Sequence, residues 1–370
     1  MKLIVKPSSI NNKNLISKKK KFLIINALIG IILIVSTTFI INNKESVFIP
    51  ETEKAARIME KSIQAIADYC SENNININSF NDPFSTGLIG PEMSEITTSI
   101  GHLEAKRSTI NPNFAAIIVN MLMEANVKRG DTIAIACSGS FPSLLLASTS
   151  AAKAMGIHPR IILSLGSSSF GASNIDFNIL DIFNILYENN IVDYKPIAIS
   201  LGGEKDIGEE FNKNIIKKLI HKIQLAGIPF LYEQDLQKNV NKRNALYLTD
   251  SLLKIKAFIN TGGAYANMGV SPLILNLRPG LIKSANIPEK SKHGMIFFML
   301  EKKIPVIHLL FIKAITQEYN LNWDPAFIPE FKNSIYNNSK HLPPVVICLS
   351  IIYLLYFIYM LFQYRMLNNI

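Results

Sequence analysis

Cysteine and tryptophan are scarce in this chain of 370 residues, which contains three cysteines and one tryptophan. Cys348 lies within a long apolar run, and Cys137 ends a segment that resembles a buried strand. Together with Cys70 they do not provide a disulfide framework. The scarcity therefore excludes a small secreted fold that is held together by disulfides.

Motifs for nucleotides and metal ions are also missing. The chain has no G-x-x-x-x-G-K-[ST] loop and no convincing G-x-G-x-x-G fingerprint. Its six histidines are scattered and lack the spacing of a structural zinc site. The sequence therefore predicts no cofactor and no metal ion.

Acidic residues are absent from both ends of the chain, so most of the net charge of +10 comes from the ends. Seven lysines precede the first apolar run and Arg365 follows the last, so 30 of the 38 basic residues lie between the runs with all 28 acidic ones. The balance there is 30 minus 28, only +2. Because the excess of positive charge is confined to the ends, nucleic-acid binding is not expected.

Two long apolar runs predict membrane helices. The runs Phe22–Ile41 and Pro344–Tyr364 are long enough to cross a hydrocarbon core of about 30 Å. No A-x-A site follows the first run, which favours an uncleaved anchor over a signal peptide. The lysines before it predict a cytoplasmic N-terminus, and two crossings then return the C-terminus to the same side. We expect a two-pass protein of the inner (cytoplasmic) membrane with an extracytoplasmic globular part.

The resulting organisation has seven parts. They are a basic cytoplasmic tail (1–21), a transmembrane helix (22–41), a membrane-proximal helical segment (42–83), an α/β domain (84–328), a linker (329–343), a transmembrane helix (344–364) and a cytoplasmic tail (365–370).

The α/β domain is predicted from apolar strands that alternate with helices. The predicted strands are 132–137, 160–165, 196–201, 229–232, 257–260 and 305–309. The predicted helices are 51–73, 111–125, 142–155, 175–189, 209–226, 236–254 and 294–302. Nearly continuous apolar strands between helices indicate a mostly parallel, doubly wound, Rossmann-like sheet that is covered on both faces.

Loops rich in glycine and serine follow four of the predicted strands. In a parallel sheet these loops meet at the carboxyl edge, where ligands bind. Backbone N–H groups, hydroxyl groups and helix N-termini favour an anion, and an extracytoplasmic domain has no ready supply of nucleotide. The predicted ligand-binding residues in these loops are Ser138, Gly139, Ser140, Gly166, Ser167, Ser168, Gly202, Gly203, Glu204, Gly262, Gly263 and Asn267.

A polar segment, Gly90–Pro112, precedes the first predicted strand and has poor helical or strand periodicity. Loops of this kind often carry binding groups. Lys106 and Arg107 are predicted to clamp a carboxylate, and Glu95 to serve as a base or a cation ligand. The alternative interpretation is a solvated surface loop with local ion pairs.

A serine nucleophile is a further hypothesis. Ser138 or Ser140 would lie on the strand-to-helix turn, although Pro142 replaces the last glycine of a G-x-S-x-G elbow. The catalytic candidates are therefore Ser138 or Ser140 with Glu95 or His102, and His308 is either a triad member or a core histidine.

Several motifs in a fixed order resemble one known family. They are GLIGPEMSEITTSIGHLEAKRSTINPNFA, GDTIAIACSGSFPSLLLASTSAAKAMG, RIILSLGSSSFGAS, SLGGEKDIG, FINTGGAYANMG, LRPGL and IPVIHLLFIKAITQEYNLNWDP. The segment from Phe84 to Pro325 resembles the poly-gamma-glutamate system protein family, membrane proteins associated with poly-gamma-glutamate capsule synthesis and export. The resemblance implies a role in making, moving or processing an anionic polymer, and it assigns no catalytic residues.

These observations lead to one expected function and two alternatives. The expected function is a membrane-anchored component of capsule biosynthesis whose α/β domain binds poly-gamma-glutamate or its terminus, next to the membrane subunits of the synthase. The first alternative is an extracytoplasmic hydrolase or transpeptidase with a serine nucleophile. The second is a scaffold for the synthase subunits.

Overall fold

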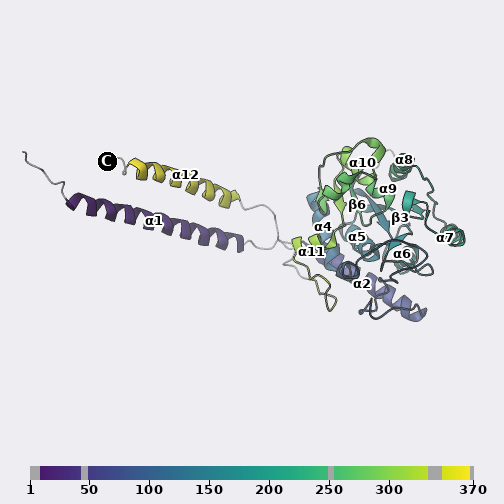
Figure 1. Cartoon of the computed structure of the whole chain (residues 1–370). Coiled ribbons are helices and arrows are strands. Elements are labelled where there is room, and N and C mark those ends of the chain that lie inside the picture. The colour runs from purple at the N-terminus through teal and green to yellow at the C-terminus, as the bar shows by residue number, and fades with distance from the viewer. Residues whose placement is uncertain (1–8, 43–48, 249–253, 332–343, 367–370) are drawn as a thin grey trace, which may run out of the picture. The chain divides into compact units, whose positions relative to one another are not determined.

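The computed structural model describes residues 9–42, 49–248, 254–331 and 344–366 (Figure 1). The chain divides into a helical unit, formed by residues 1–47 and 337–370, and a globular unit, formed by residues 48–336. The helical unit contains α1 (Ser9–Asn42) and α12 (Pro344–Met366), which contact each other. Most of the predicted linker 329–343 lies outside the described residues.

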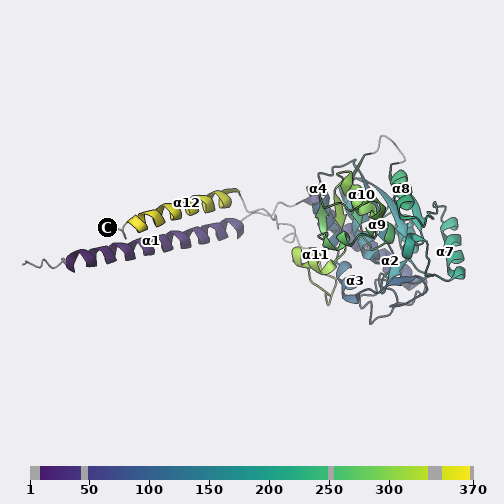
Figure 2. The ribbon, with the colours of Figure 1, turned by 45° about the horizontal axis from the view of Figure 1, so that its top comes forward.

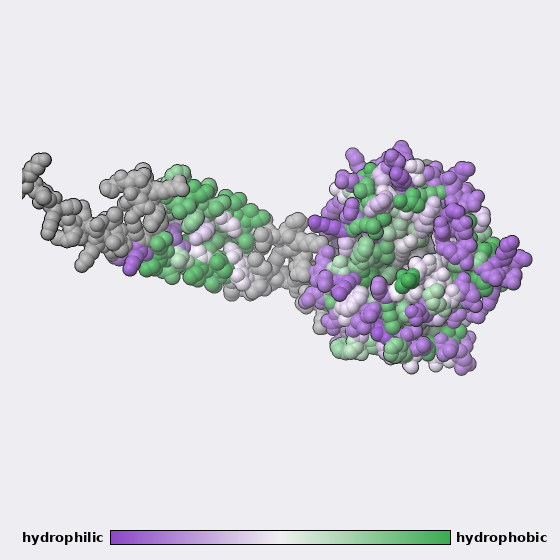
Figure 3. Space-filling view, viewed as in Figure 1, coloured by the Kyte–Doolittle hydropathy of each residue, from purple (hydrophilic) through white to green (hydrophobic). Residues whose placement is uncertain are grey.

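One helix of the described chain is long and apolar enough to cross a membrane. This stretch is Val345–Phe362 in α12, with a mean hydropathy of 2.6, and α1 contains a shorter apolar stretch, Leu23–Thr38. Hydrophobic residues cover much of the described helical unit, whereas hydrophilic residues cover much of the visible face of the globular unit (Figure 3). A single candidate span is thus present among the described residues, and the second span and the two-pass topology stay predictions.

Helix α2 (Pro50–Glu72) belongs to the core of the globular unit. Pro50 occupies its first turn, where a missing N–H costs nothing. Its predicted apolar stripe is buried and packs against α4 (Asn113–Glu124) and α5 (Pro142–Met155). The predicted separation of residues 42–83 as a membrane-proximal segment is therefore wrong for α2, because the stripe has its partners inside the globular unit.

The globular unit is built around a six-stranded sheet. Its order is β5 (Ala198–Ser200), β3 (His158–Ser164), β2 (Thr132–Ser138), β6 (Ile255–Asn260), β8 (Val306–His308) and β7 (Gly280–Ile282). All neighbours are parallel except β7 and β8. β2 is the first of these strands in the sequence. The next two, β3 and β5, lie on one side of it, and the later strands β6 and β8 lie on the other. This order creates a switch point between β2 and β6, and it confirms the predicted mostly parallel, Rossmann-like α/β fold.

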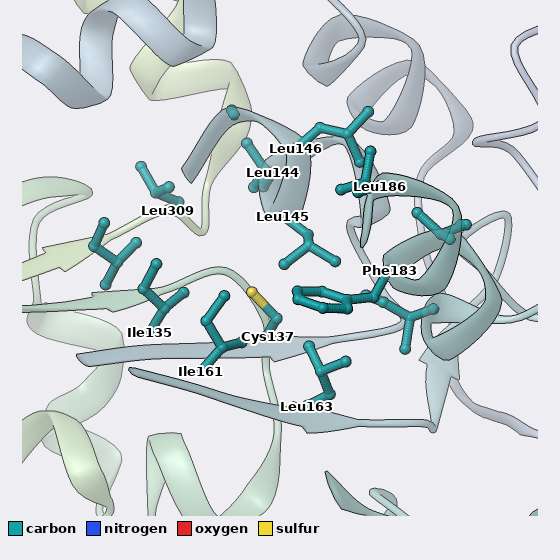
Figure 4. Packing of buried hydrophobic residues seen from close by; sticks show 14 of the residues in the cluster. Ile135, Cys137, Leu144, Leu145, Leu146, Ile161, Leu163, Phe183, Leu186 and Leu309 are labelled. Atoms are coloured by element: carbon teal, nitrogen blue, oxygen red, sulfur yellow. The ribbon is translucent and has the colours of Figure 1, made fainter. Parts of the chain in front are cut away.

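Alternation along β2 explains why both faces of the sheet are covered. Ile133, Ile135 and Cys137 enter one buried cluster, whereas Ala134 and Ala136 enter a second cluster. The first cluster packs against α5 and α6 (Ile179–Glu188) (Figure 4). The second packs against α8 (Leu236–Tyr247) and α10 (Met295–Glu301). Figures 1 and 2 show these two layers of helices around the strands.

Several elements differ from the sequence predictions. The predicted strand 229–232 is reduced to a bridge between Phe230 and Ile199, and β7 was not predicted. The polar segment before β2 contains a strand and a helix where a loop was expected. The remaining elements are β1 (Thr97–Ser99), α3 (Leu103–Thr109), β4 (Ser167–Ser168), α7 (Lys213–Leu225), α9 (Tyr265–Met268), α11 (Ile312–Glu318) and the 3₁₀ turns Glu204–Asp206, Pro272–Asn276 and Lys290–Lys292.

Candidate functional site

A cavity of about 1020 Å³ opens at the carboxyl edge of the sheet. The strand-following loops and α3, α9 and α11 line it, as expected for a crevice at the switch point of a doubly wound sheet. Of the residues predicted from sequence, those that line it are His102, Lys106, Ser138, Ser140, Gly166, Ser168, Gly202, Gly203, Glu204 and Gly263. The predicted convergence of the four loops is therefore present.

The switch point itself is tightly packed. Ser138 ends β2 and is 3% exposed, and the loop after β6 passes directly over it at Gly262. A Cβ atom at Gly262 would lie 3.0 Å from Ser138 Cβ, closer than ordinary van der Waals contact. Glycine at this position allows the loop after β6 to approach Ser138, which lines the cavity.

A short parallel pairing brings α3 to the cavity. β1 pairs with β4, and Ser99 lies opposite Ser168. Ser167 N–H donates to Ile96 O at 3.1 Å, and Ser169 N–H donates to Ser99 O at 2.9 Å. This pairing fixes the polar segment before β2 against the loop that follows β3.

Lys106 on α3 is almost completely buried, with 2% of the residue exposed. Its Nζ donates to Ser140 O and to Ser168 Oγ, the latter at 2.8 Å. The Phe141 ring covers the ammonium group at 3.6 Å from the ring centroid. Burial lowers the pKa of Lys106 to about 7, because removal from water disfavours the charged form.

Two serines complete this part of the wall. Ser140 Oγ accepts a hydrogen bond from Ser168 N–H at 3.0 Å, which ties the loop after β2 to the loop after β3. In the described part of the chain, Lys106 Nζ is the partner found for Ser168 Oγ. Sequence reasoning placed Lys106 and Ser168 in separate motifs and gave no signal that their side chains meet.

The predicted Lys106–Arg107 clamp is not formed. Neighbouring positions on α3 point in different directions, so Arg107 leaves the cavity. Its guanidinium donates to Phe80 O and Asn81 O and lies 3.5 Å from the Asp324 carboxylate.

Five other predicted residues also lie outside the cavity lining. Glu95 borders a separate shallow hollow with Pro91 and Asn174. The other four are Gly139, Ser167, Gly262 and Asn267. Asn267 is buried, and its amide atoms have no hydrogen-bond partner among the described residues.

Among the described residues, neither His102 nor His308 is hydrogen-bonded to Ser138 or Ser140. His308 is fully buried at the end of β8 and does not line the cavity, and its Nδ1 lies 3.2 Å from Asn260 Nδ2. Burial lowers the pKa of His308 to about 4. His102 lines the cavity, but no hydrogen bond joins it to a serine in the described residues. His308 is therefore a core histidine, and the pairing of His102 with Ser138 or Ser140 stays a prediction.

The mouth of the cavity carries charges of both signs. Glu204 and Glu210 follow β5 at one side, and Lys313 follows β8 on the other side of the switch point. Sequence reasoning missed Glu210, Lys313 and the aromatic lining residues Phe141, Tyr265, Phe311 and Trp323. Phe141, Glu210 and Tyr265 lie beside the Gly/Ser-rich loops, which was the available signal, whereas Phe311, Lys313 and Trp323 follow β8, where the sequence has no such loop.

A buried ion pair supports the loop after β5 and was also missed. Asp206 and Arg243 are both fully buried and bonded to each other. Asp206 Oδ1 accepts from Ser200 Oγ at 2.7 Å and from Ser164 Oγ at 3.3 Å. Asn239 Nδ2 donates to Asp206 Oδ2 at 3.2 Å. The network therefore joins the ends of β3 and β5 to α8 behind the cavity.

Gly171 provides a test of how closely the loops pack. A Cβ atom there would lie 2.9 Å from Ser140 O and still closer to Gly139 O and Ser167 Oγ. We expect Gly171→Ala to lower the free energy of unfolding by about 1–3 kcal/mol. Gly263→Ala is the control, because no atom lies within 4 Å of its added Cβ. Equal thermal unfolding temperatures for the two variants would contradict this packing.

Comparisons of the chain with family models, with curated proteins and with solved structures gave no match.

Proposed function

We propose that the globular unit binds the end of a carboxylate-bearing chain, and that this chain is poly-gamma-glutamate, the polymer implied by the sequence resemblance. The observation that carries the proposal is the cavity at the switch point, with Gly/Ser loops as its floor and charges of both signs at its mouth. An internal segment of such a polymer carries only carboxylates as charged groups. The amino terminus of the polymer adds an ammonium group. A terminus with charges of both signs matches a cavity mouth that carries Glu204, Glu210 and Lys313.

The mixed lining argues against bulk attraction of a polyanion. Glu104, Glu204 and Glu210 oppose Lys106 and Lys313 in the lining, so the cavity is not a strongly positive surface. Recognition then depends on local pairing, with an ammonium group at Glu204 and Glu210 and a carboxylate at Lys313.

The cellular setting belongs to the same proposal. A membrane anchor through α12, a second span at residues 22–41 and an extracytoplasmic globular unit would hold the cavity beside a polymer as it leaves the membrane. Contact with membrane subunits of a synthase follows from this placement. Support comes from the candidate span in α12 and from the lysines that precede the first apolar run.

Binding of a γ-linked glutamate oligomer tests the proposal. We expect the purified full-length chain in detergent to bind the free oligomer about tenfold more tightly than its N-acetylated form, since one ion pair is lost. Lys313→Met is expected to weaken binding of both oligomers to a similar degree, as seen by isothermal titration calorimetry.

Lys217→Met is the matched control, because Lys217 is exposed on α7 and does not line the cavity. Absence of binding by either oligomer would reject the proposed ligand. Equal affinities for the free and acetylated oligomers would reject recognition of the amino terminus.

A further inference from the structure

Lys106 and Ser168 form an unusual contact for a buried lysine. Lys106 Nζ lies 2.8 Å from Ser168 Oγ, and no carboxylate is found as its partner in the described part of the chain. The two residues come from different elements, α3 and β4, so the contact depends on the β1–β4 pairing. Both residues line the cavity.

The surroundings of Lys106 favour an uncharged amine. A buried ammonium group without an acidic partner loses its hydration and gains no ion pair in return. Its pKa of about 7 means that a large fraction of the amine is neutral near neutral pH. In that state the lone pair of Nζ is able to accept the hydroxyl hydrogen of Ser168.

Space around the serine oxygen is kept open by a glycine. Gly101 also lines the cavity, and a Cβ atom there would lie 3.1 Å from Ser168 Oγ and 2.6 Å from Ser169 O. Any side chain at this position would crowd the hydroxyl. Ser168 itself is 7% exposed and lines the cavity, and its hydrogen bond with Lys106 Nζ is buried.

We infer that Ser168 is a nucleophile and Lys106 its general base, for acyl transfer at an amide carbonyl of the ligand held in the cavity. The inference rests on the proposed function for the identity of that ligand. It places the reaction on Ser168, whereas the sequence pointed to Ser138 or Ser140. A serine with a lysine base is a known alternative to the serine–histidine arrangement.

The reaction balances without a cofactor. Ser168 Oγ forms a bond to the carbonyl carbon as its proton moves to Lys106 Nζ. The C–N bond then breaks, and Lys106 returns the proton to the departing amine, which leaves an ester on Ser168. Water or the amine of a second chain attacks this ester, giving hydrolysis or transfer, and the serine hydroxyl is restored.

Two measurements on the full-length chain in detergent test the inference. The first is labelling by an alkyl fluorophosphonate, in which Ser168 Oγ bonds to phosphorus and fluoride leaves, with the site located by peptide mass spectrometry. The second is incubation with a γ-linked glutamate oligomer and hydroxylamine, in which acyl transfer yields a hydroxamate. We expect both signals in the wild type and at least a hundredfold loss in Ser168→Ala and Lys106→Met.

Ser169→Ala is the matched control, because Ser169 lies in the same loop but does not line the cavity. Its labelling is expected to match the wild type. No label, or a label on Ser138 or Ser140, would overturn the inference. Trp323 fluorescence reports whether Lys106→Met is folded. If that variant is misfolded, the labelled position in the wild type and the loss of label in Ser168→Ala still decide whether Ser168 is the nucleophile.

The two proposals fail separately. An oligomer that binds without giving a hydroxamate or a fluorophosphonate label would remove the dyad and leave the binding function. A labelled Ser168 in a protein that binds no γ-linked oligomer would keep the dyad and reject the proposed ligand.

Discussion

Asp206→Asn is expected to lower the free energy of unfolding of the globular unit by about 3–5 kcal/mol. The substitution keeps the shape of the side chain but removes the charge that is bonded to Arg243, and both residues are fully buried. A guanidinium group would then remain out of water without a counterion. At roughly 2–4 °C per kcal/mol, the unfolding temperature should fall by about 10 °C. Fluorescence of Trp323, the single tryptophan, follows this unfolding.

A double variant distinguishes the loss of the whole ion pair from the loss of one of its charges. Asp206→Asn combined with Arg243→Met removes both charges, so it should recover most of the loss seen in Asp206→Asn alone. Glu209→Gln is the matched control in the same loop, because the Lys205–Glu209 pair is exposed and should leave the unfolding temperature unchanged. A wild-type unfolding temperature for Asp206→Asn would show that the buried pair does not hold the loop.

The sheet was predictable because its strands are short apolar runs between helices. The strand Thr132–Ser138 and the helix Pro142–Met155 match the expectations closely, since a buried parallel strand and a proline at the first helical turn leave clear patterns. The segment 229–232 has the same apolar character but forms a single bridge. Composition alone does not distinguish a central strand from an extended segment beside the edge.

The cavity was predictable as a place and less so in its chemistry. Loops that follow parallel strands must meet at one edge, so the convergence of Ser138, Gly166, Gly202 and Gly263 follows from topology. Topology does not determine the direction in which a side chain on a short helix points. Lys106 and Arg107 are adjacent in sequence, yet one is buried against Ser168 and the other pairs with Asp324.

The two contacts that could not be predicted from the sequence join residues that are far apart in the chain. Arg243 lies 37 positions after Asp206, and Lys106 lies 62 positions before Ser168. Nothing local to these residues marks them as partners, because the first contact joins α8 to the loop after β5 and the second depends on the β1–β4 pairing. Sequence patterns report the period of each element, whereas these contacts depend on how the elements are placed against one another.

Lys106→Met is expected to remove a pH dependence of stability that the wild type shows above pH 7. Lys106 has a pKa of about 7 when folded, against an ordinary value of 10.5. Between these values the unfolded chain binds one proton more than the folded chain, so the free energy of unfolding rises with pH. Below pH 7 the amine is protonated in both states, and the burial of its charge costs about 3–5 kcal/mol.

Thermal unfolding followed by Trp323 fluorescence between about pH 6 and 8.5 measures this effect, with an expected wild-type gain of about 2 kcal/mol from pH 7 upward. Burial raises the pKa of Cys70 to about 11 and of Cys137 to about 12, so both lower stability only above their ordinary value of 9. Lys217→Met should follow the wild-type curve. Since Lys106→Met removes the titrating amine, parallel curves for that variant and the wild type would mean that the buried lysine keeps its charge throughout, and the amine would then be unavailable as a base for Ser168.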